Sequence, residues 1–357
     1  MKIGIDVQAT EGKLTGLGVY TQNLVRTLME EKRNGFEFSL FSETQEGDWN
    51  TWQRLVWENS TLPSRARKER VEILHVPAFS PPWAKPCRLV VTVHDLIGMT
   101  FPNQLGLPSR LYWGKWLPRA VKRADAIIAD SENSKRDILR LLDVMESKIR
   151  VIYPSGHEGF YPEKDPAKLA AAKKRLGIHK SYFLAVGTVE PRKNIARIIE
   201  AFLRFIQKEN CSDYQLVLVG LTHFAHGAFL KSILQDNREE KNILLAGYVE
   251  KGELNALYSG AAAFLFPSLY EGFGIPVLEA MAAGTPVLTS RASSLPEVAG
   301  EAAYYVDAYD TESIALGIKK MYESKDSQKE YSLKGLVQAK RFSWKKTAGG
   351  TINAYES

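Results

Sequence analysis

The stretch FPSLYEGFGIPVLEAMAAGTPV, from Phe266 to Val287, decides the fold of this chain. It begins at the end of a short apolar run that a proline closes, which is typical of a buried strand end. Gly272 and Gly274 then allow the backbone to turn tightly and to approach a ligand closely. Pro276 suits the start of a helix, and Gly284, with the proline two residues later, ends that helix after about two turns.

Two carboxylates flank this glycine turn. Glu271 is expected on the loop at the carboxyl end of the strand, and Glu279 in the first turn of the helix. The free N–H groups at the helix start, around Gly274 and Ile275, form a site for an anion. Carboxylates beside an anion suit a ligand that also carries hydroxyl groups, because they accept hydrogen bonds from vicinal diols. A sugar nucleotide has both kinds of group.

The pattern E-G-F-G-x-P-x-L-E-A-M-A-x-G-x-P-V resembles the Glu-x7-Glu signature of the retaining glycosyltransferases of GT-B fold, the group 1 glycosyl transferases. That family includes bacterial mannosyl-, glucosyl- and N-acetylglucosaminyltransferases. The glycines and prolines between the two glutamates make the match specific, and the resemblance extends to nearly the whole chain. It implies an α/β protein in which two doubly wound, Rossmann-like domains with parallel sheets face a cleft.

Composition agrees with a soluble protein of about two domains, with 357 residues, 45% apolar and 25% charged. Cys87 and Cys211 lie far apart without metal-like spacing, which indicates a reducing compartment. The start MKIGIDVQ reaches Asp6 before an apolar signal core could form, so we expect a first strand and no export signal. The notable uncharged run 254–270 is too interrupted to span a bilayer. We expect a cytoplasmic protein, with the inner face of the membrane as an alternative location.

Positive charge gathers in residues 63–125, which hold 11 Lys or Arg and 4 Asp or Glu. This segment includes RARKER at 65–70 and a basic stretch at 107–123 with Trp113 and Trp116. Basic side chains beside tryptophan suit the headgroups of an anionic membrane. The alternative is a solvated basic helix whose tryptophans face the core. Nucleic acid is disfavoured as a partner, because no known binding module accompanies the charge.

Candidate strands alternate with helices along the chain, which indicates parallel sheets covered on both faces. The turn-rich segment 153–161 predicts the boundary between two domains. The resemblance implies an N-terminal acceptor-binding domain over residues 1–155, completed by a C-terminal helix at 342–357, and a nucleotide-sugar-binding domain over 156–341. The candidate strands are 2–7, 36–41, 73–76, 89–94, 126–129 and 149–153, then 183–186, 215–219, 243–246, 263–266, 286–289 and 304–306.

Two candidate sites lie in the N-terminal half. Gly16 and Gly18 follow the first strand, but the loop is long and a third glycine is missing, so this is no dinucleotide fingerprint and could be a simple turn. The resemblance implies that these glycines close over the donor's diphosphate. His94 ends the strand LVVTVH; a single histidine is more often structural, but the family's V-H-D pattern implies contact with the transferred sugar through its 6-hydroxyl.

Arg192 and Lys193 follow the strand YFLAVGTV and precede a helix. Adjacent cations there suit a diphosphate leaving group, whose growing negative charge they stabilise. A solvated helix start is a weaker explanation, because cations oppose the helix dipole. The resemblance implies that Lys193 contacts the diphosphate, usually aided by an arginine five residues earlier. This chain has Thr188 at that position, which leaves Arg192 as the nearest substitute.

The resemblance implies the remaining donor contacts. Glu271 would hold sugar hydroxyls, including the 3-hydroxyl, and Glu279 the ribose hydroxyls. Val249 matches the position where the family holds the nucleobase by backbone contacts. The backbone that would hold the diphosphate and orient the sugar ring comprises Gly272, Phe273, Gly274 and Ile275.

The sequence has no D-x-D motif and no His/Cys/Asp cluster with metal-ligand spacing, so we expect no metal and no cofactor. The predicted function is retaining transfer of a hexose from a nucleotide-diphosphate sugar to a glycan or lipid-linked acceptor in cell-surface polysaccharide assembly. GDP-mannose is favoured over a UDP-hexose as donor, because T-V-E-P-R-K-N and V-H-D-L-I look most like the mannosyl and rhamnosyl branch. The alternatives are a nucleotide-sugar epimerase and a non-enzymatic nucleotide-sugar-binding subunit. A Rossmann oxidoreductase is disfavoured. Such an enzyme needs a tighter glycine loop after the first strand and an acidic residue after the second strand to bind the ribose, and neither is clear in this sequence.

Overall fold

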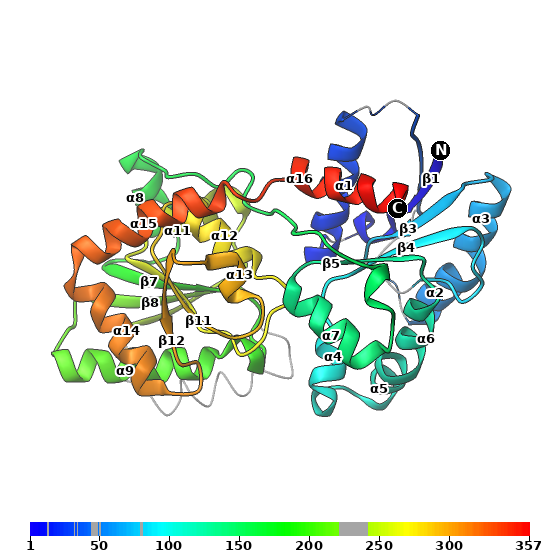
Figure 1. The fold of residues 1–357 in the computed structure, drawn as a ribbon. Coiled ribbons are helices and arrows are strands. Elements are labelled where there is room, and N and C mark those ends of the chain that lie inside the picture. Colours follow the sequence, from blue (N-terminus) through cyan, green and yellow to red (C-terminus); the bar gives the residue numbers. More distant parts are fainter. Residues whose placement is uncertain are drawn as a thin grey trace. The chain divides into compact units, whose positions relative to one another are not determined.

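The computed structural model describes residues 1–12, 14–31, 33, 35–43, 49, 51–78, 81–220 and 242–357. The chain forms two compact units: unit 1 is Met1–Pro154 with Phe342–Ser357, and unit 2 is Ser155–Arg341. Figure 1 shows a parallel sheet with helices on both faces in each unit.

Unit 1 contains a six-stranded parallel sheet in the order β2-β1-β3-β4-β5-β6. Its central strands are short runs of buried Ile, Leu, Val and Ala, as expected where both faces of a parallel sheet are covered. The strands are β1 Lys2–Asp6, β2 Glu37–Phe41, β3 Ile73–Val76, β4 Arg88–Val93, β5 Ala126–Ala129 and β6 Ile149–Val151.

Helices cover both faces of this sheet. On one face, α1 and α16 pack against the strands, with Leu24, Trp344 and Tyr355 among the buried side chains. On the other, α3, α6 and α7 contribute Leu62, Val121 and other apolar side chains to a second core. The α-helices of unit 1 are α1 Gly16–Glu30, α2 Thr51–Val56, α3 Leu62–Lys68, α4 Ile97–Thr100, α5 Leu107–Leu111, α6 Leu117–Lys122, α7 Glu132–Leu142 and α16 Trp344–Glu356. Short 3-10 or π segments are η1 Gln8–Thr10, η2 Trp57–Thr61, η3 Pro102–Gln104, η4 Tyr112–Trp116 and η5 Glu146–Lys148.

Unit 2 repeats the plan with the sheet order β12-β11-β10-β7-β8-β9. The strand order reverses between β7 and β10, which lie side by side although 76 residues separate Val186 from Ala263 in numbering. Ligands of doubly wound sheets bind at the carboxyl ends of the strands that meet at such a switch point. The strands are β7 Ser181–Val186, β8 Tyr214–Val219, β9 Ile243–Gly247, β10 Ala263–Phe266, β11 Val287–Ser290 and β12 Ala303–Val306.

The helices of unit 2 also pack on both faces. Buried Ile198, Phe202 and Phe205 repeat at helical spacing on α9, which with α14 covers the face that carries Ala263 and Leu265. The alternate residue Phe264 points to the opposite face, where its ring lies 5.3 Å from Tyr258 of α11. The helices are α8 Pro166–Arg175, η6 Pro191–Lys193, α9 Ile195–Glu209, α11 Lys251–Gly260, α12 Ile275–Ala282, α13 Leu295–Ala299, α14 Thr311–Glu323 and α15 Lys325–Ala339.

The predicted fold class is confirmed: both sheets are parallel, six-stranded and doubly wound. Two local predictions need correction. Glu279 is the fifth residue of α12 and therefore lies in its second turn, because the helix begins at Ile275 directly after the left-handed Gly274. Gly16 and Gly18 lie in the first turn of α1 and not in a loop before it. A side chain at residue 18 would place Cβ 2.3 Å from the Ala9 carbonyl oxygen, so close packing requires that glycine.

Candidate functional site

The candidate site of unit 2 lies where the chain leaves the two switch-point strands. After β7 it turns at Gly187, whose φ of +146° favours glycine, and enters the short helix η6 with Arg192 and Lys193. After β10 it runs through residues 267–274 into α12. The Leu269 amide donates to the Arg192 carbonyl oxygen at 2.7 Å and joins the two segments. The sheet topology therefore brings together residues that are far apart in the sequence.

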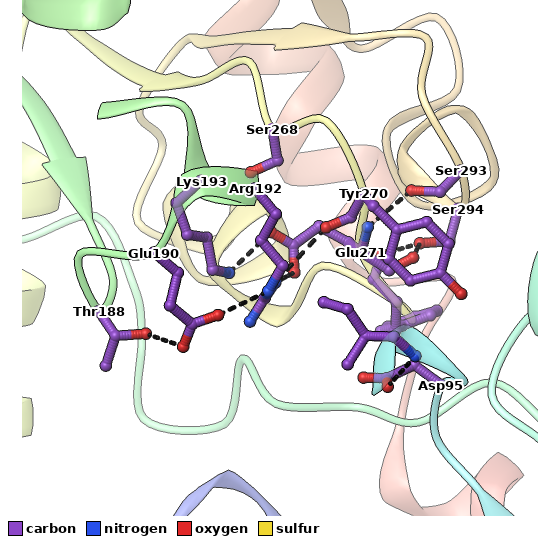
Figure 2. A network of polar contacts seen from close by, with 12 residues as sticks. Asp95, Thr188, Glu190, Arg192, Lys193, Ser268, Tyr270, Glu271, Ser293 and Ser294 are labelled. Atoms are coloured by element: carbon purple, nitrogen blue, oxygen red, sulfur yellow. Dashed lines mark hydrogen bonds and ion pairs between the residues drawn. The ribbon is translucent and has the colours of Figure 1, made fainter. Parts of the chain in front are cut away.

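Glu271 stands between the two predicted cations (Figure 2). Its Oε2 accepts a hydrogen bond from Arg192 Nη1 at 2.8 Å, and its Oε1 lies 2.7 Å from Lys193 Nζ. Arg192 Nε also donates to Glu190 Oε2 at 2.7 Å. The four side chains form a network of alternating charge, in which each predicted cation is paired with a carboxylate.

The charged side chains at the centre of this network are buried. Lys193 and Glu271 expose only 9% and 6% of their surface. Burial lowers the pKa of the Lys193 ammonium below its usual range, although the Glu271 carboxylate counteracts part of that effect. The ammonium also lies 4.7 Å from the centre of the Phe266 ring. A cation with so little water around it depends on nearby anions, whether a protein carboxylate or a bound phosphate.

Two serines of the loop after β11 hold the Glu271 loop in place. Ser293 Oγ accepts a hydrogen bond from the Glu271 amide at 2.8 Å. Ser294 Oγ lies 2.9 Å from the Glu271 carbonyl oxygen and 2.7 Å from that of Phe273, and it is fully buried. The sequence analysis missed both residues. Their position just after a strand that neighbours β10 is the signal that could have drawn attention to them.

The loop ends at Gly274, which adopts φ +112° and caps α12. The helix begins at Ile275, directly after the Glu271 loop, and the Ile275 amide has no preceding helical carbonyl to bond. Pro276 has no N–H, and the Val277 amide donates to the Gly274 carbonyl oxygen at 3.0 Å. Residue 156 packs against the same helix start, because a Cβ there would lie 2.5 Å from Ile275 Cγ2. The predicted anion site is thus next to the charged network in the same unit.

Glu279 is supported by Tyr258, another residue that the sequence analysis missed. The Tyr258 hydroxyl donates to Glu279 Oε2 at 3.1 Å. Burial raises the pKa of Glu279 from its ordinary 4.5 to about 7, even though the Tyr258 hydrogen bond and the charges of Lys251 and Lys193 act in the opposite direction. This carboxyl therefore changes its charge near neutral pH. The influence of Lys193 on it also shows that Glu279 belongs to the same electrostatic environment as the network.

Val249 follows β9, on the other side of β8 from β7, and is buried. Gly247 before it turns with φ +65°, and Tyr248 between them exposes 68% of its surface. The segment leads into α11, which carries Tyr258. Val249 is thus linked to Glu279 through one helix, and no direct contact of Val249 with the charged network is observed in the described residues.

His94 belongs to unit 1, where both its ring nitrogens are engaged. Nδ1 lies 2.6 Å from Asp130 Oδ2 at the end of β5, and Nε2 lies 2.7 Å from the Pro77 carbonyl oxygen. Burial by itself would lower the pKa of His94, but the Asp130 carboxylate and these hydrogen bonds raise it overall. The ring packs edge-on against Tyr20 of α1 at 4.6 Å, so the structure brings His94 together with the helix that begins at Gly16. Asp130 is a further residue that the sequence analysis missed.

Among the described residues, no group of three or more His, Cys, Asp or Glu side chains is arranged to hold a metal ion. Within the same ranges, no helix has both the length and the apolar character needed to cross a bilayer.

The chain is similar to known proteins over both units. Family models described as Glycosyl transferases group 1 and Glycosyltransferase Family 4 match residues 169–335 and 14–155. The chain is 33% identical over 284 residues to the O-antigen chain mannosyltransferase B of Escherichia coli, covering 80% of this chain and 74% of that protein. It is 32% identical over 239 residues to the O-antigen chain mannosyltransferase RfbU of Salmonella typhimurium, covering 66% and 62%.

Solved structures show the same fold at low identity. The sucrose-phosphate synthase from Thermosynechococcus elongatus superposes with a TM-score of 0.78 at 18% identity, covering 99% of this chain and 98% of that one. Anabaena HepE in complex with UDP-glucose gives a TM-score of 0.76 at 15% identity, covering 100% and 99%. The two doubly wound units are therefore those of a GT-B fold.

Proposed function

We propose a reaction for this chain, which belongs to the group 1 glycosyl transferases and is a retaining hexosyltransferase. The chain would transfer mannose from GDP-mannose to a glycan or lipid-linked acceptor during assembly of a cell-surface polysaccharide. The mannosyltransferase names of its relatives support that choice of sugar. A UDP-hexose is the second candidate donor, because a structural neighbour binds UDP-glucose.

One observation carries the proposal: Arg192 and Lys193 converge on Glu271 at the switch point of unit 2. In the donor complex the two cations would hold the diphosphate, and Glu271 would turn to the sugar hydroxyls. Negative charge grows on the diphosphate as the glycosidic bond breaks, so cations placed there stabilise the transition state more than the ground state. The amides of Gly274 and Ile275 would add to this stabilisation.

The other donor contacts follow from the same placement. Glu279, held by Tyr258, would accept hydrogen bonds from the ribose, and the backbone at Val249 would hold the base. The Gly272–Phe273 backbone, fixed by Ser294 at Phe273, would orient the sugar ring. Retention of configuration without an evident nucleophile suggests attack from the face that the diphosphate leaves, with the departing phosphate helping to deprotonate the acceptor.

Unit 1 would supply the acceptor site together with His94 and the start of α1 at Gly16 and Gly18. Asp130 holds the His94 ring through Nδ1 and acts against burial to raise its pKa, so the ring would be fixed in orientation at the end of β4. Contact with the 6-hydroxyl of the sugar would require Nε2 to exchange the Pro77 carbonyl oxygen for that hydroxyl.

The charges of the donor would be balanced by Arg192, Lys193 and helix amides, so we propose transfer that does not need a divalent metal. The first experiment is the shift in melting temperature with GDP, UDP, ADP and NAD, each with and without EDTA. A selective rise with GDP or UDP that survives EDTA is expected. A rise with NAD alone, or one that EDTA abolishes, would contradict the proposed donor site.

The epimerase and the non-enzymatic subunit are separated from a transferase by a second measurement. GDP-mannose is incubated with the protein, with and without a polysaccharide or lipid-linked glycan fraction as acceptor, and the products are identified. A transferase forms a new glycosidic bond only when the acceptor is present. Conversion of the donor sugar without acceptor would indicate an epimerase, and binding without any conversion would indicate a binding subunit.

We further propose that unit 1 meets an anionic membrane surface, where a lipid-linked acceptor would be found. Leu107 and Leu111 on α5 expose 71% and 47% of their surface, and the exposed Trp116 ring lies 5.1 Å from the exposed Trp83 ring. Trp113 instead packs against the core of unit 1, whereas Trp116 is exposed. Exposed basic residues of the same segment are Arg110, Lys115, Arg119, Lys122 and Arg123.

Sedimentation with lipid vesicles tests this surface. Binding is expected to vesicles that contain phosphatidylglycerol and to weaken with salt, but not to pure phosphatidylcholine. Trp116→Ala should reduce binding, whereas Tyr309→Ala, which removes an aromatic ring exposed to 68% on unit 2, should not. Equal behaviour of the two variants would contradict the assignment.

A further inference from the structure

The Arg192 guanidinium is held from two sides by two different carboxylates. Nε donates to Glu190 Oε2 at 2.7 Å, and Nη1 donates to Glu271 Oε2 at 2.8 Å. Glu190 is in turn held by Thr188, whose hydroxyl donates to Oε1 at 2.8 Å. Figure 2 shows this line of side chains from Thr188 through Glu190 and Arg192 to Glu271.

Glu271 and Glu190 differ in whether they would keep their bond to Arg192 when the donor binds. If the proposed function is correct, Glu271 turns to the sugar hydroxyls when the donor binds, and Arg192 loses that partner. Glu190 has no such second task and stays bonded through its other oxygen to Thr188. An arginine side chain has about 2 kcal/mol of rotamer entropy to lose, so a partner that remains through the reaction keeps the guanidinium oriented.

Thr188 suits this task for a local reason. It follows Gly187 at the end of β7, and its β-branched side chain has few χ1 rotamers. Its hydroxyl occupies one oxygen of Glu190 and leaves the other for Arg192. The ionised form of Glu190 persists as well: burial works against it, but Arg192 and Thr188 outweigh burial and lower the pKa of this carboxyl.

We propose that Thr188 and Glu190 are positioning residues that hold Arg192 in place for the leaving diphosphate. In this chain the hydroxyl stands where the resembling family usually has an arginine, and it acts on the diphosphate through Glu190 and Arg192 instead of directly. This inference rests on the proposed donor site.

The test uses Thr188→Val, which removes the hydroxyl without changing charge and with little change in size. Dissociation constants are measured for GDP and GMP, and for UDP and UMP, and the pair that the wild-type protein binds is used. We expect Thr188→Val to weaken diphosphate binding about five- to tenfold, consistent with partial loss of a charge-assisted hydrogen bond. The same variant should weaken monophosphate binding less than about twofold. Thr188→Ser keeps the hydroxyl and should restore the wild-type ratio of the two constants. A general structural disturbance would change both constants alike.

A double-mutant cycle shows whether the hydroxyl acts through Glu190. In the Glu190→Ala background, Thr188→Val should change the ratio of diphosphate to monophosphate affinity less than about twofold, because its partner is gone. Melting temperatures of all variants verify that they fold, and Thr188→Ala serves as the second variant if Thr188→Val does not.

Two results would overturn the inference while leaving the donor site intact. One is an unchanged ratio in Thr188→Val, and the other is the same loss in the presence and absence of Glu190. If the wild-type protein binds neither GDP nor UDP, the proposed function itself fails, and the positioning role fails with it.

Discussion

Lys193 is the residue whose replacement should reveal the diphosphate site most directly. It is buried, pairs with Glu271 at 2.7 Å, and would exchange that partner for a phosphate. Lys193→Ala should weaken GDP or UDP binding by about 1.5–3 kcal/mol, or roughly tenfold to a hundredfold, as for a charge-assisted hydrogen bond. Titration calorimetry measures the change. Lys329→Ala removes the same charge from an exposed site on α15 and is the control; equal losses in both variants would point to a general charge effect.

Glu279 predicts a pH dependence of nucleotide binding. Its pKa is raised by burial to about 7, and a ribose hydroxyl donates more strongly to the ionised form. Nucleotide affinity should therefore increase as the pH rises from 6 to 8. Tyr258→Phe removes a hydrogen bond that lowers this pKa, so the midpoint should move to higher pH. Glu279→Gln corrects for titration of the phosphate itself, and an identical pH profile in that variant would rule out this role.

The raised pKa of Glu279 also makes the free energy of unfolding depend on pH. Between pH 4.5 and about 7 the folded protein keeps the proton on Glu279 that the unfolded chain has lost. The free energy of unfolding therefore falls as the pH rises through this window, by up to about 1.4 kcal/mol per pH unit from this group. Glu279→Gln should flatten that part of the stability profile.

Single residues also show why part of the site escaped prediction. Glu271, Arg192 and Lys193 could be found because each follows a strand in a recognisable local pattern. Tyr258, Glu190 and Ser294 matter only through a contact to a residue elsewhere in the fold, and their own surroundings in the sequence are ordinary.

At the scale of the element, α12 depends on Gly274. An alanine there would have to adopt φ +112°, and its Cβ would lie 3.0 Å from Leu295 Cδ2. Gly274→Ala should cost about 1–3 kcal/mol of stability and should also weaken nucleotide binding, because it displaces the helix start. Chemical denaturation and calorimetry measure the two effects.

The matched control is Gly349→Ala in α16, where a Cβ meets nothing within 4 Å. Because alanine has a higher helix propensity than glycine, Gly349→Ala should leave the stability unchanged or raise it by up to about 1 kcal/mol. If Gly274→Ala behaves like this control, the left-handed turn does not fix the helix start.

The sequence predicted which segments form strands and helices better than it predicted the residue at which each helix begins. Alternation of apolar runs with helical periodicity predicted both sets of strands, because a run of only three to six residues is enough to form each strand. The start of α12 and of α1 depended on single backbone torsions and close contacts, such as Gly18 against Ala9. For that reason Glu279 was placed one turn too early and Gly16 was taken for a loop residue.

At the scale of the whole molecule, the proposed donor contacts are unequally divided between the units. Arg192, Lys193, Glu271 and Glu279 all belong to unit 2. Addition of GDP or UDP should therefore slow amide hydrogen exchange mainly in residues 187–194 and 268–282. Mass spectrometry of the full chain measures this. Protection confined to unit 1 would contradict the assignment of the nucleotide to unit 2.

The return of α16 to unit 1 has a consequence for how the protein is made. Trp344, Ile352 and Tyr355 cover a face of the first sheet, yet the ribosome produces them after all of unit 2. During synthesis that face stays uncovered while some 190 residues emerge, at about 5–20 residues per second. Unit 2 is continuous and can complete its core first. The unit that is translated first thus completes its packing only after the last helix of the chain has been made.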